Sequence, residues 1–292
     1  LMTIKSKIIS FCLGLIGRSW AMVFVGGGYR VKIYDNQPGQ AAKAITEIRK
    51  QLGELEEVRM LRGELNASQQ LALLSSHDDL SQALEGAFFV QECVFEQLEV
   101  KQSLFQDIER LVGKDVILSS STSCLVPSSV FSKVHNRSRY FRLIKYKLHK
   151  PVGQAPVYLK KEIDGFALNR VQAAIIAESW RLVQDGIISV KDIDLVMSEG
   201  LGMRYAFIGP METIHLNAPE GLEDYMKRYG EGIRRILNSF RPVPEFSSEG
   251  AKSIINEMCD LIPNDKQHLS ARIERRDQLL LGLAKLKKEH SK

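Results

Sequence analysis

The chain has 292 residues, a formal net charge of +5, 44% hydrophobic residues and 26% charged residues. This apolar content fits a soluble globular protein with one large or two ordinary domains. The four cysteines, Cys12, Cys93, Cys124 and Cys259, form no CxxC pair and have no histidine at ligand spacing. Their scatter argues against a zinc or other metal site and against a disulfide framework, and it favours a reducing compartment.

The first residues raise the question of a targeting signal. Lys5 and Lys7 precede the apolar run "IISFCLGLIG", as in a signal peptide. That run stops at Arg18, no clear small-residue cleavage site follows, and the chain continues in a strand–helix–strand rhythm. No segment reaches the roughly 18 apolar residues of a membrane span. We therefore predict a cytoplasmic protein with no membrane partner.

The segment up to Asp35 predicts a nucleotide-binding strand–turn–helix–strand unit. "KIISFC" is a short β-branched strand, "RSWAMVF" has helical character, and "YRVKIYD" alternates as a second strand. Three consecutive glycines after the helix end it where left-handed backbone is needed. The turn before the helix contains Gly14, Leu15, Ile16 and Gly17, which match the second half of G-x-G-x-x-G. Such a turn brings the backbone close to a pyrophosphate at the helix N-terminus.

Asp35 supports the prediction of a dinucleotide site, and Cys12 weakens it. Asp35 follows Gly17 by about 18 residues, where an acid accepts hydrogen bonds from the ribose hydroxyls and repels a 2′-phosphate. NAD is therefore predicted over NADP. Cys12 replaces the first glycine of the motif, and a side chain at this tight turn costs strain. A lone GxxG also occurs in ordinary strand-to-helix turns, so the flanking strands and Asp35 support the prediction.

The rest of the first half alternates helices and strands. Helices are predicted over "AAKAITEIRKQLGELEE", "NASQQLALL", "LSQALEG" and "EQLEVKQSLFQDIERLV", and strands over "AFFVQECV" and "DVILSSS". Glu96 and Lys101 follow the first of these strands, at the edge where open α/β sheets bind ligands. A solvated helix start would explain them equally, because the helix dipole alone favours glutamate there. A polar turn, "STSC", follows the second strand.

The second half is predicted to be helical. From Ile163 the apolar residues recur with a period of 3.6 and end at Asp185–Gly186. Ser189 and Asp192 form a plausible capping box for the next helix. "GLGMRYAFIGP" is predicted to be a loop, a helix spans about 220–239, and a last helix covers "LSARIERRDQLLLGLAKLKK". His215 is predicted to be a hydrogen-bonded helix residue and not a catalytic base.

Four segments together resemble the 3-hydroxyacyl-CoA dehydrogenase family: "ILSSSTSCLVPS", "GFALNRVQAAIIAESWRLV", "DLVMSEGLGMRYAFIGPMETIHLN" and "RPVPEFS". The resemblance runs along nearly the whole chain. It implies an α/β fold, with a Rossmann-type NAD-binding domain over 1–159, its sheet truncated, and an all-helical domain over 160–292 that serves substrate binding and homodimer formation. The implied reaction is NAD-linked oxidation of the 3-hydroxyl of a small hydroxy acid, such as the L-gulonate used by one member.

The resemblance also implies roles for individual residues. Ser123 in "STSC" matches the serine that hydrogen-bonds the substrate hydroxyl, and Asn169 in "GFALNR" matches the asparagine that holds the substrate or the catalytic histidine. Glu96 and Lys101 match positions that contact the nicotinamide end of the cofactor. Asp35 matches the ribose-binding acid.

Arg204 is a candidate for binding the substrate. A sugar acid has a carboxylate, and an arginine binds a carboxylate with two parallel hydrogen bonds. Arg204 belongs to one of the resembling segments, so we predict that it anchors the substrate carboxylate. A structural or interface arginine is an equally good interpretation.

The catalytic histidine of the family and its glutamate partner are not readable in this sequence. A histidine is the natural base for removing the hydroxyl proton, and a carboxylate orients it. In the family the histidine and the glutamate lie in a segment after the serine turn. Here the chain resumes the family pattern at "GQAP", about two dozen residues sooner than the family does, and no matching segment is found between the two. His135 and His149 are the nearby histidines, and surface or core roles are predicted for both. The competing interpretation is a catalytically silent structural protein that at most binds NAD.

A basic segment coincides with this gap. From Lys133 to Lys161 there are nine lysines or arginines and no acid. A solvated loop that replaces lost strands is the preferred interpretation, and a skipped exon or wrong splice is an alternative. Tyr140, Phe141 and Tyr146 interleave with the cations, as in some nucleic-acid-binding surfaces. We nevertheless predict no nucleic-acid partner, because charge runs are usually solvated.

Overall fold

A computed structural model describes residues 5–11, 14–136, 155, 157–247 and 249–290 of the chain. Two compact units make up the structure, one over residues 1–170 and one over residues 171–292. The boundary predicted after residue 159 falls earlier than this division. The basic segment lies mostly outside the described residues, as do Cys12, His149 and the three aromatic residues between the cations.

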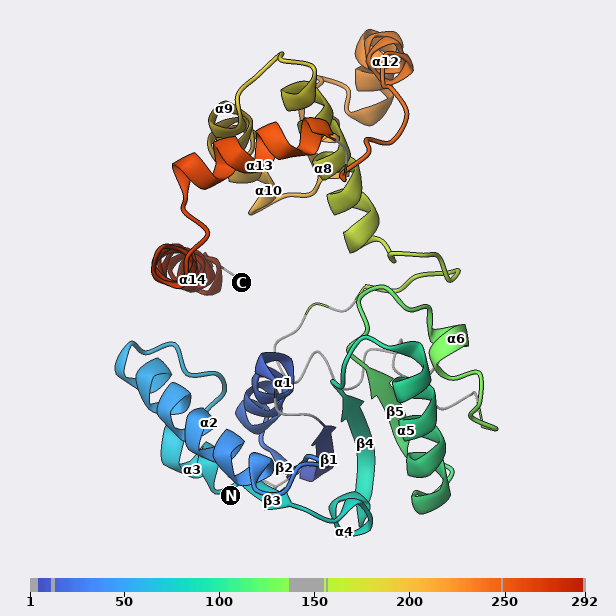
Figure 1. The fold of residues 1–292 in the computed structure, drawn as a ribbon, viewed down its shortest axis with the longest axis vertical. Coiled ribbons are helices and arrows are strands. Elements are labelled where there is room, and N and C mark those ends of the chain that lie inside the picture. Colours follow the sequence, from blue (N-terminus) through green and yellow to red (C-terminus); the bar gives the residue numbers. More distant parts are fainter. Residues whose placement is uncertain (1–4, 12–13, 137–154, 156, 248, 291–292) are drawn as a thin grey trace. The chain divides into compact units, whose positions relative to one another are not determined.

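The first unit is built on a five-stranded sheet with the order β3-β2-β1-β4-β5 (Figure 1). All neighbouring strands are parallel. The chain moves outward from β1 to β3 and then returns to the other side of β1 for β4 and β5. The reversal between β1 and β4 is the switch point at which open α/β sheets bind ligands. The strands are β1 (Lys5–Phe11), β2 (Tyr29–Tyr34), β3 (Leu74–His77), β4 (Ala87–Glu92) and β5 (Ile117–Ser120).

Helices cover both faces of this sheet. The two apolar cores of the unit divide between the faces, since Phe89 belongs to one and Val90 to the other, and successive strand residues point to opposite sides. One core joins the sheet to α1 and α2, and the other joins it to α5 and α6. The helices of the unit are α1 (Leu15–Gly26), α2 (Gln40–Glu57), α3 (Ala67–Leu71), α4 (Leu80–Leu84), α5 (Leu98–Leu111) and α6 (Pro127–Val130), and α8 (Leu168–Gln184) begins in it.

The predicted strand–turn–helix–strand unit is confirmed. Gly14 stands at the N-cap of α1 with extended backbone, and Gly17 is buried in the first turn. Gly28 ends the connection to β2 with φ of +79°, a conformation that a side chain would strain. The glycine run therefore has the predicted role at the helix C-terminus.

Strand β3 was missed by the sequence interpretation. It follows the short helix α3, whose predicted extent reached residue 74, where β3 begins. Asn66 caps α3 by accepting a hydrogen bond from the backbone N of Gln69, and the side chain of Gln69 accepts one from the backbone N of Asn66. The strand has only four residues and lies at the sheet edge, with two residues exposed, so it lacks the apolar run that marks a buried strand.

The second unit is helical. It contains the rest of α8, followed by α9 (Val190–Leu195), a π-helical turn (Val196–Leu201), α10 (Gly202–Tyr205), α11 (Pro210–Leu216), α12 (Leu222–Asn238), α13 (Glu249–Leu261) and α14 (Lys266–His290). Ser189 caps α9 through the backbone of Asp192, as predicted. Helix α13 was not predicted. Among the described residues, no helix has both the length and the apolar character needed to cross a membrane.

The start of the loop predicted over 200–210 is helical instead. The π-helical turn runs directly into α10, and Gly202 lies at the junction. A Cβ on Gly202 would stand 2.6 Å from the carbonyl oxygen of Met197. The glycine therefore permits a close backbone approach inside a helix and does not mark a loop.

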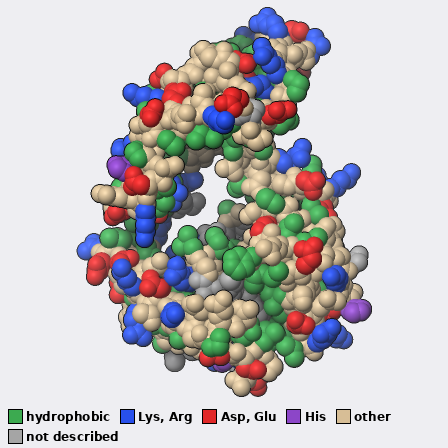
Figure 2. Space-filling view, in the orientation of Figure 1, with side chains coloured by type: hydrophobic (Ala, Val, Ile, Leu, Met, Phe, Trp, Pro, Cys, Tyr) green, Lys and Arg blue, Asp and Glu red, His purple; other side chains and the backbone are tan. Residues whose placement is uncertain are grey.

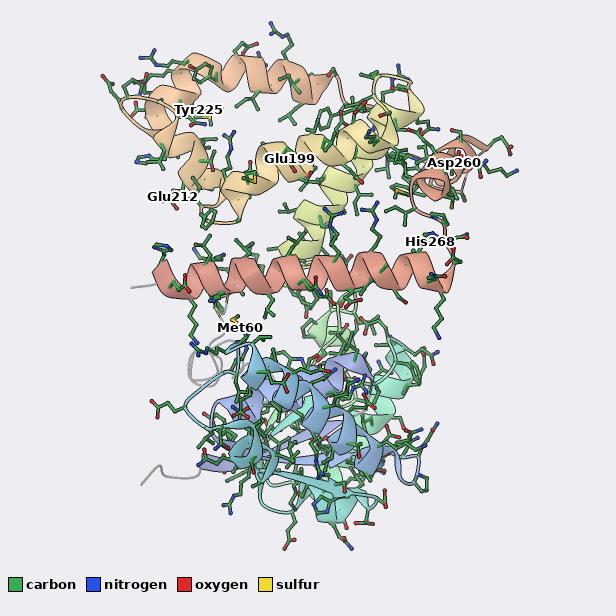
Figure 3. All side chains as sticks on the ribbon, turned by 90° about the vertical axis from the view of Figure 1, so that its left-hand side faces the viewer. Met60, Glu199, Glu212, Tyr225, Asp260 and His268 are labelled. Atoms are coloured by element: carbon green, nitrogen blue, oxygen red, sulfur yellow. The ribbon has the colours of Figure 1, made fainter. Side chains whose placement is uncertain are left out.

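The helical unit leaves most of its apolar side chains exposed. Helix α8 has no buried residue, although Leu168, Val171 and Ile175 form the predicted apolar stripe. Helix α14 also buries none of its residues, and Figure 3 shows its side chains projecting all along the helix that begins near His268. Hydrophobic side chains are visible on the surface of the molecule in Figure 2. Exposed apolar surface of this extent is typical of interaction sites.

Candidate active site at the carboxyl edge of the sheet

The predicted site residues of the first unit follow the carboxyl ends of its strands. Gly14 comes after β1, Asp35 after β2, Glu96 after β4, and Ser123 after β5. Parallel strands end at the same edge of a sheet, so these residues gather on one side of the unit. Asn169, near the start of α8, joins them through a hydrogen bond described below.

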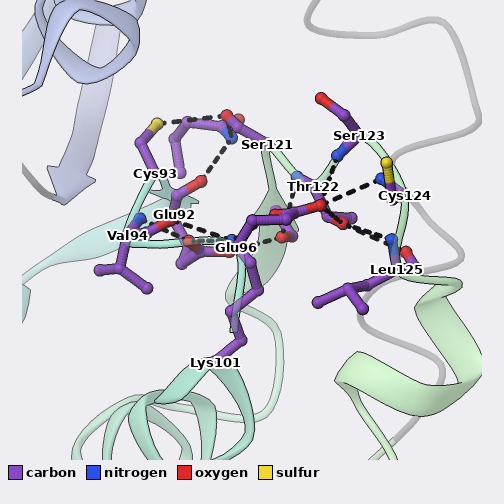
Figure 4. Close-up of polar contacts among 12 residues, drawn as sticks. Glu92, Cys93, Val94, Glu96, Lys101, Ser121, Thr122, Ser123, Cys124 and Leu125 are labelled. Atoms are coloured by element: carbon purple, nitrogen blue, oxygen red, sulfur yellow. Dashed lines mark hydrogen bonds and ion pairs between the residues drawn. The ribbon is translucent and has the colours of Figure 1, made fainter. Parts of the chain in front are cut away.

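Glu96 holds the serine turn in place. Its Oε1 accepts hydrogen bonds from Thr122 Oγ1 at 2.6 Å, from the backbone N of Ser123 at 2.8 Å and from the backbone N of Cys124 at 3.0 Å (Figure 4). Burial alone would raise the pKa of Glu96, but these bonds, led by that of Thr122, and the Lys101 ammonium lower it to about 2. The carboxylate is therefore ionised at neutral pH and fixes the conformation of residues 122–124.

A buried ion pair lies beneath this carboxylate. The Lys101 ammonium is 1% exposed and lies 2.8 Å from Glu92 Oε1 and 3.2 Å from Glu96 Oε2. It also donates to the carbonyl of Val94 at 3.1 Å. These three oxygens use all three N–H groups of the ammonium. A direct contact of Lys101 with a cofactor stays a prediction, and it would require breaking one of these bonds.

Glu92 is a site residue that the sequence interpretation missed. It is fully buried at the end of β4, accepts from the backbone N of Val94 at 2.6 Å and from Ser120 Oγ at 2.5 Å, and pairs with Lys101. It thereby joins the end of β4 to the end of β5. A glutamate inside the strand "AFFVQECV" was the available signal, because a charged residue within a buried strand needs a partner nearby.

The structure brings Ser123 and Asn169 together. Asn169 Nδ2 donates to the backbone carbonyl of Ser123 at 2.5 Å. The Ser123 side chain is exposed, and its backbone is held from both sides, by Glu96 at the N–H and by Asn169 at the carbonyl. This geometry presents the hydroxyl on a rigid turn. The catalytic roles of both residues stay predictions.

The region beside Asp35 is hollowed. A cavity of about 580 Å³ is lined by apolar side chains of α4, α5 and the strand ends, together with the acidic groups of Asp35, Glu99 and Asp107. Asp35 Oδ1 accepts from the backbone N of Gln37 at 2.8 Å, which fixes the carboxylate at the rim. An apolar cavity with a fixed acid fits an adenosine group, whose ribose hydroxyls donate to the carboxylate.

The start of α1 fits a pyrophosphate. The N-cap Gly14 supplies no side-chain cap, and the first turn contains no acidic residue. A Cβ on Gly14 would find nothing within 4 Å, so the space beside the turn is open. Leu15 and Ile16 are exposed at this end of the helix. The unsatisfied N–H groups and the positive end of the helix dipole favour an anion here.

Arg204 and the two described histidines with predicted roles take no part in the contacts described above. Arg204 is exposed on α10 in the helical unit, and its substrate role stays a prediction. His135 Nδ1 lies 3.1 Å from Glu109 Oε2. Glu109 follows Lys101 by eight residues on α5, about 12 Å along the helix axis, so this pair is remote from the serine turn. His215 Nδ1 accepts from the backbone N of Leu222, as a hydrogen-bonded helix residue does.

Replacing Glu96 with glutamine is expected to change the acid stability of the protein. A depressed pKa gives stability that is full above the ordinary value of 4.5 and is lost as the pH falls toward about 2. Because the side chain is partly exposed, this contribution is about 1–2 kcal/mol at neutral pH. The difference in unfolding free energy between the two proteins should therefore shrink from pH 5 to pH 2 in urea titrations. A difference that is independent of pH would contradict the assignment.

Comparisons with known proteins identify the family of the chain. The family model of the 3-hydroxyacyl-CoA dehydrogenase NAD-binding domain matches residues 9–149, and that of the C-terminal domain matches residues 165–257. A lambda-crystallin homolog from Rattus norvegicus is 48% identical over 300 positions, covering 94% of this chain and 94% of the relative. Lambda-crystallin from Oryctolagus cuniculus is 46% identical over 302 positions, with 94% of each chain covered.

A solved structure shows the same fold along the whole chain. The crystal structure of 5-formyl-3-hydroxy-2-methylpyridine 4-carboxylic acid 5-dehydrogenase, an NAD⁺-dependent dismutase, has a TM-score of 0.79 and 20% identity, covering 98% of this chain and 99% of that chain. The predictions of a Rossmann-type unit followed by a helical unit, and of NAD as the cofactor of the family, are confirmed. The chain is similar to lambda-crystallin over nearly its full length, and it belongs to the 3-hydroxyacyl-CoA dehydrogenase family of NAD-dependent dehydrogenases.

Proposed function

We propose that this chain binds NAD at the carboxyl edge of the sheet and descends from an enzyme that oxidises the 3-hydroxyl of a small hydroxy acid, with L-gulonate as the first substrate to test. The observation that supports this most is the rigid turn at Ser123, which Glu96 and Asn169 hold at the same sheet edge as the uncapped start of α1. Bound NAD would accept a hydride from the carbon that bears the hydroxyl group. The residues of the chain bind NAD and the hydroxy acid and orient them toward each other.

Most of the predicted site residues have a direct role in this proposal. The first turn of α1, from Gly14 to Gly17, receives the pyrophosphate, and Asp35 receives the adenosine ribose. Ser123 donates or accepts at the substrate hydroxyl, where the exposed side chain is available. Asn169 fixes the backbone of this serine. Arg204, from the helical unit, is proposed to bind the carboxylate of the substrate.

We also propose that the histidine–glutamate pair of the family is missing from this chain. In the described part of the first unit, the histidines are His77 and His135. His135 pairs with Glu109 far along α5, and His77 ends β3, four strand spacings or about 19 Å from β5. Neither imidazole is therefore placed to take a proton from a hydroxyl beside Ser123.

The lengths of the alignments support the loss of a segment. The rat relative aligns over 300 positions, while 94% of 292 residues is about 274, so about 26 positions have no residue of this chain. This agrees with the two dozen residues by which the sequence resumes the family pattern early. The loss favours a second candidate function, a catalytically silent, crystallin-like structural protein that retains NAD binding.

Self-association completes the proposal. The exposed apolar stripe of α8 and the unburied helix α14 require a covering surface, and a second copy of the chain offers the same faces. We therefore propose a homodimer formed through the helical unit, located in the cytosol.

Two measurements separate the enzyme from the silent protein. Titration with NADH should quench Trp20 fluorescence, and an Asp35→Ala variant should bind NADH at least about tenfold more weakly, because a charged acceptor of the ribose hydroxyls is lost. An Asp164→Ala variant, which removes an exposed carboxylate of the same unit, serves as the control. Absence of quenching in the parent chain would refute NAD binding.

The second measurement follows reduced cofactor formation with NAD and L-gulonate. A chain without the proton-accepting pair is expected to be slower than a lambda-crystallin homolog by a factor of about 10²–10⁴. An equal rate would refute the loss of the pair and would identify the chain as a working dehydrogenase.

A further inference from the structure

Arg18 is an unpartnered cation at the nucleotide-binding end of α1. Its Nε atom is buried and has no hydrogen-bond partner. Among the described contacts, its guanidinium takes part in no ion pair or ring contact, and the first turn of α1 contains no acid that could pair with it. A buried N–H without an acceptor is unfavourable, because it has lost water and gained nothing in return. The described part of the chain provides no acceptor for this N–H group.

Arg181 provides the contrast. Its Nε is also buried without an acceptor, but its guanidinium pairs with Glu178 and lies 5.4 Å from the centre of the Phe240 ring. The charge of Arg181 is therefore compensated within the helical unit. Arg18 has no comparable compensation, which indicates that its partner is a bound anion.

The position of Arg18 indicates which anion. Its backbone N donates to the carbonyl of Gly14 at 3.3 Å, so it stands one turn into the helix. Side chains on a helix generally lean toward its N-terminus, which favours an orientation of Arg18 toward the Gly14 turn. The open space beside Gly14 and the exposed Leu15 and Ile16 lie at this same end. The substrate hydroxyl site at Ser123 follows β5, two strands away from β1.

We propose that Arg18 binds the pyrophosphate of NAD through paired N–H···O bonds, an assignment that rests on the proposed NAD site. The guanidinium fork matches two phosphate oxygens, and its charge adds to the positive end of the α1 dipole.

The test uses two variants of the full chain, Arg18→Met and Arg49→Met. Methionine keeps an unbranched apolar side chain and removes the charge, and Arg49 is an exposed arginine on α2 that supplies a control of equal charge change. Calorimetry measures the affinity for NADH and for ADP, which share the pyrophosphate. Differential scanning measures the melting temperature of the ligand-free protein.

Arg18→Met is expected to weaken both ligands at least about tenfold while the ligand-free melting temperature stays the same or rises, since a buried unpartnered group is removed. Arg49→Met should leave both affinities within about twofold. Arg18→Lys, which retains the charge without the fork, should fall between the parent and the methionine variant.

Three results would overturn the assignment. NADH affinity unchanged by Arg18→Met would show that the guanidinium does not reach the cofactor, while leaving the NAD site itself intact. An equal loss of NADH affinity in Arg49→Met would show that the effect comes from the change in net charge and not from the position of Arg18. A lower melting temperature of ligand-free Arg18→Met would indicate a structural role instead. If the parent chain bound neither NADH nor ADP, the proposed function and this inference would both fail.

Discussion

Replacing Lys101 with methionine is expected to destabilise the first unit by about 3–5 kcal/mol. The ammonium compensates the fully buried Glu92 and one oxygen of Glu96, and removing it leaves a carboxylate in the interior without its cation. Removing one partner of a buried ion pair is more destabilising than replacing the whole pair with apolar residues. The reason is that the buried Glu92 carboxylate has lost its hydration and no longer has a cation to compensate for it. Domains are typically stable by about 5–15 kcal/mol, so a loss of this size should markedly lower the urea concentration at which the first unit unfolds.

The measurement needs a probe for the first unit alone. In a Trp180→Phe background, the fluorescence of Trp20 reports on α1, where its ring stacks on Phe24 at 5.4 Å. Urea titration of this background with and without Lys101→Met gives the difference in unfolding free energy.

Two further variants make the result specific. Lys50→Met, which breaks the exposed pair with Glu54, should cost less than about 1 kcal/mol. Adding Glu92→Gln to Lys101→Met should recover part of the loss, because the uncompensated charge is then absent. A Lys101→Met variant as stable as its parent would show that the carboxylates do not depend on the ammonium.

If the proposed homodimer forms, replacing Ile175 with glutamate is expected to convert it to a monomer. The side chain is part of the α8 stripe with Leu168 and Val171, which the helical unit itself leaves exposed. If a second copy covers this stripe, a charge there is buried without a partner on association. The loss should exceed about a hundredfold in the dissociation constant, since charges in an apolar interface centre cost several kcal/mol.

Analytical ultracentrifugation over a range of concentrations measures this constant. Ala173→Glu is the matched control, because it adds the same charge to an exposed position on the opposite side of α8. It should leave the dimer intact. A parent chain that is monomeric at all concentrations would contradict self-association, and dimers of both variants would show that another face forms the contact.

Much of the first unit was predictable because its signals are local. Alternation marked the strands, the glycine run marked the end of α1, and parallel strands then required that Asp35, Glu96 and Ser123 reach the same edge. The missing pieces were those that tertiary structure decides. Strand β3 has four residues and gains its identity from pairing with β2, which no four-residue window reveals. Gly202 looked like a loop residue because the close approach to Met197 exists only after the π-helical turn forms.

The electrostatic design of the site was also beyond the sequence. Glu96 and Lys101 were identified by position, but their actual partners are separated from them along the chain. Glu96 reaches Thr122 across 26 residues, and Lys101 reaches Glu92 in the preceding strand. Which atom of a carboxylate meets which donor depends on the packing of α5 against the sheet. A single sequence does not encode this in any short pattern.

The hold of Glu96 on residues 122–124 has a consequence for how this lineage can change. The turn that carries the Ser123 hydroxyl is held at the backbone N of Ser123 by the Glu96 carboxylate, which pairs with Lys101 of α5. It is held at the backbone carbonyl of Ser123 by Asn169. These contacts come from residues 92–101 and from Asn169. The support of the loop is therefore separate from the group that removes the hydroxyl proton. A protein of this lineage can lose catalytic turnover and keep its dinucleotide site, and new chemistry can be engineered beside Ser123 without redesigning the supporting contacts.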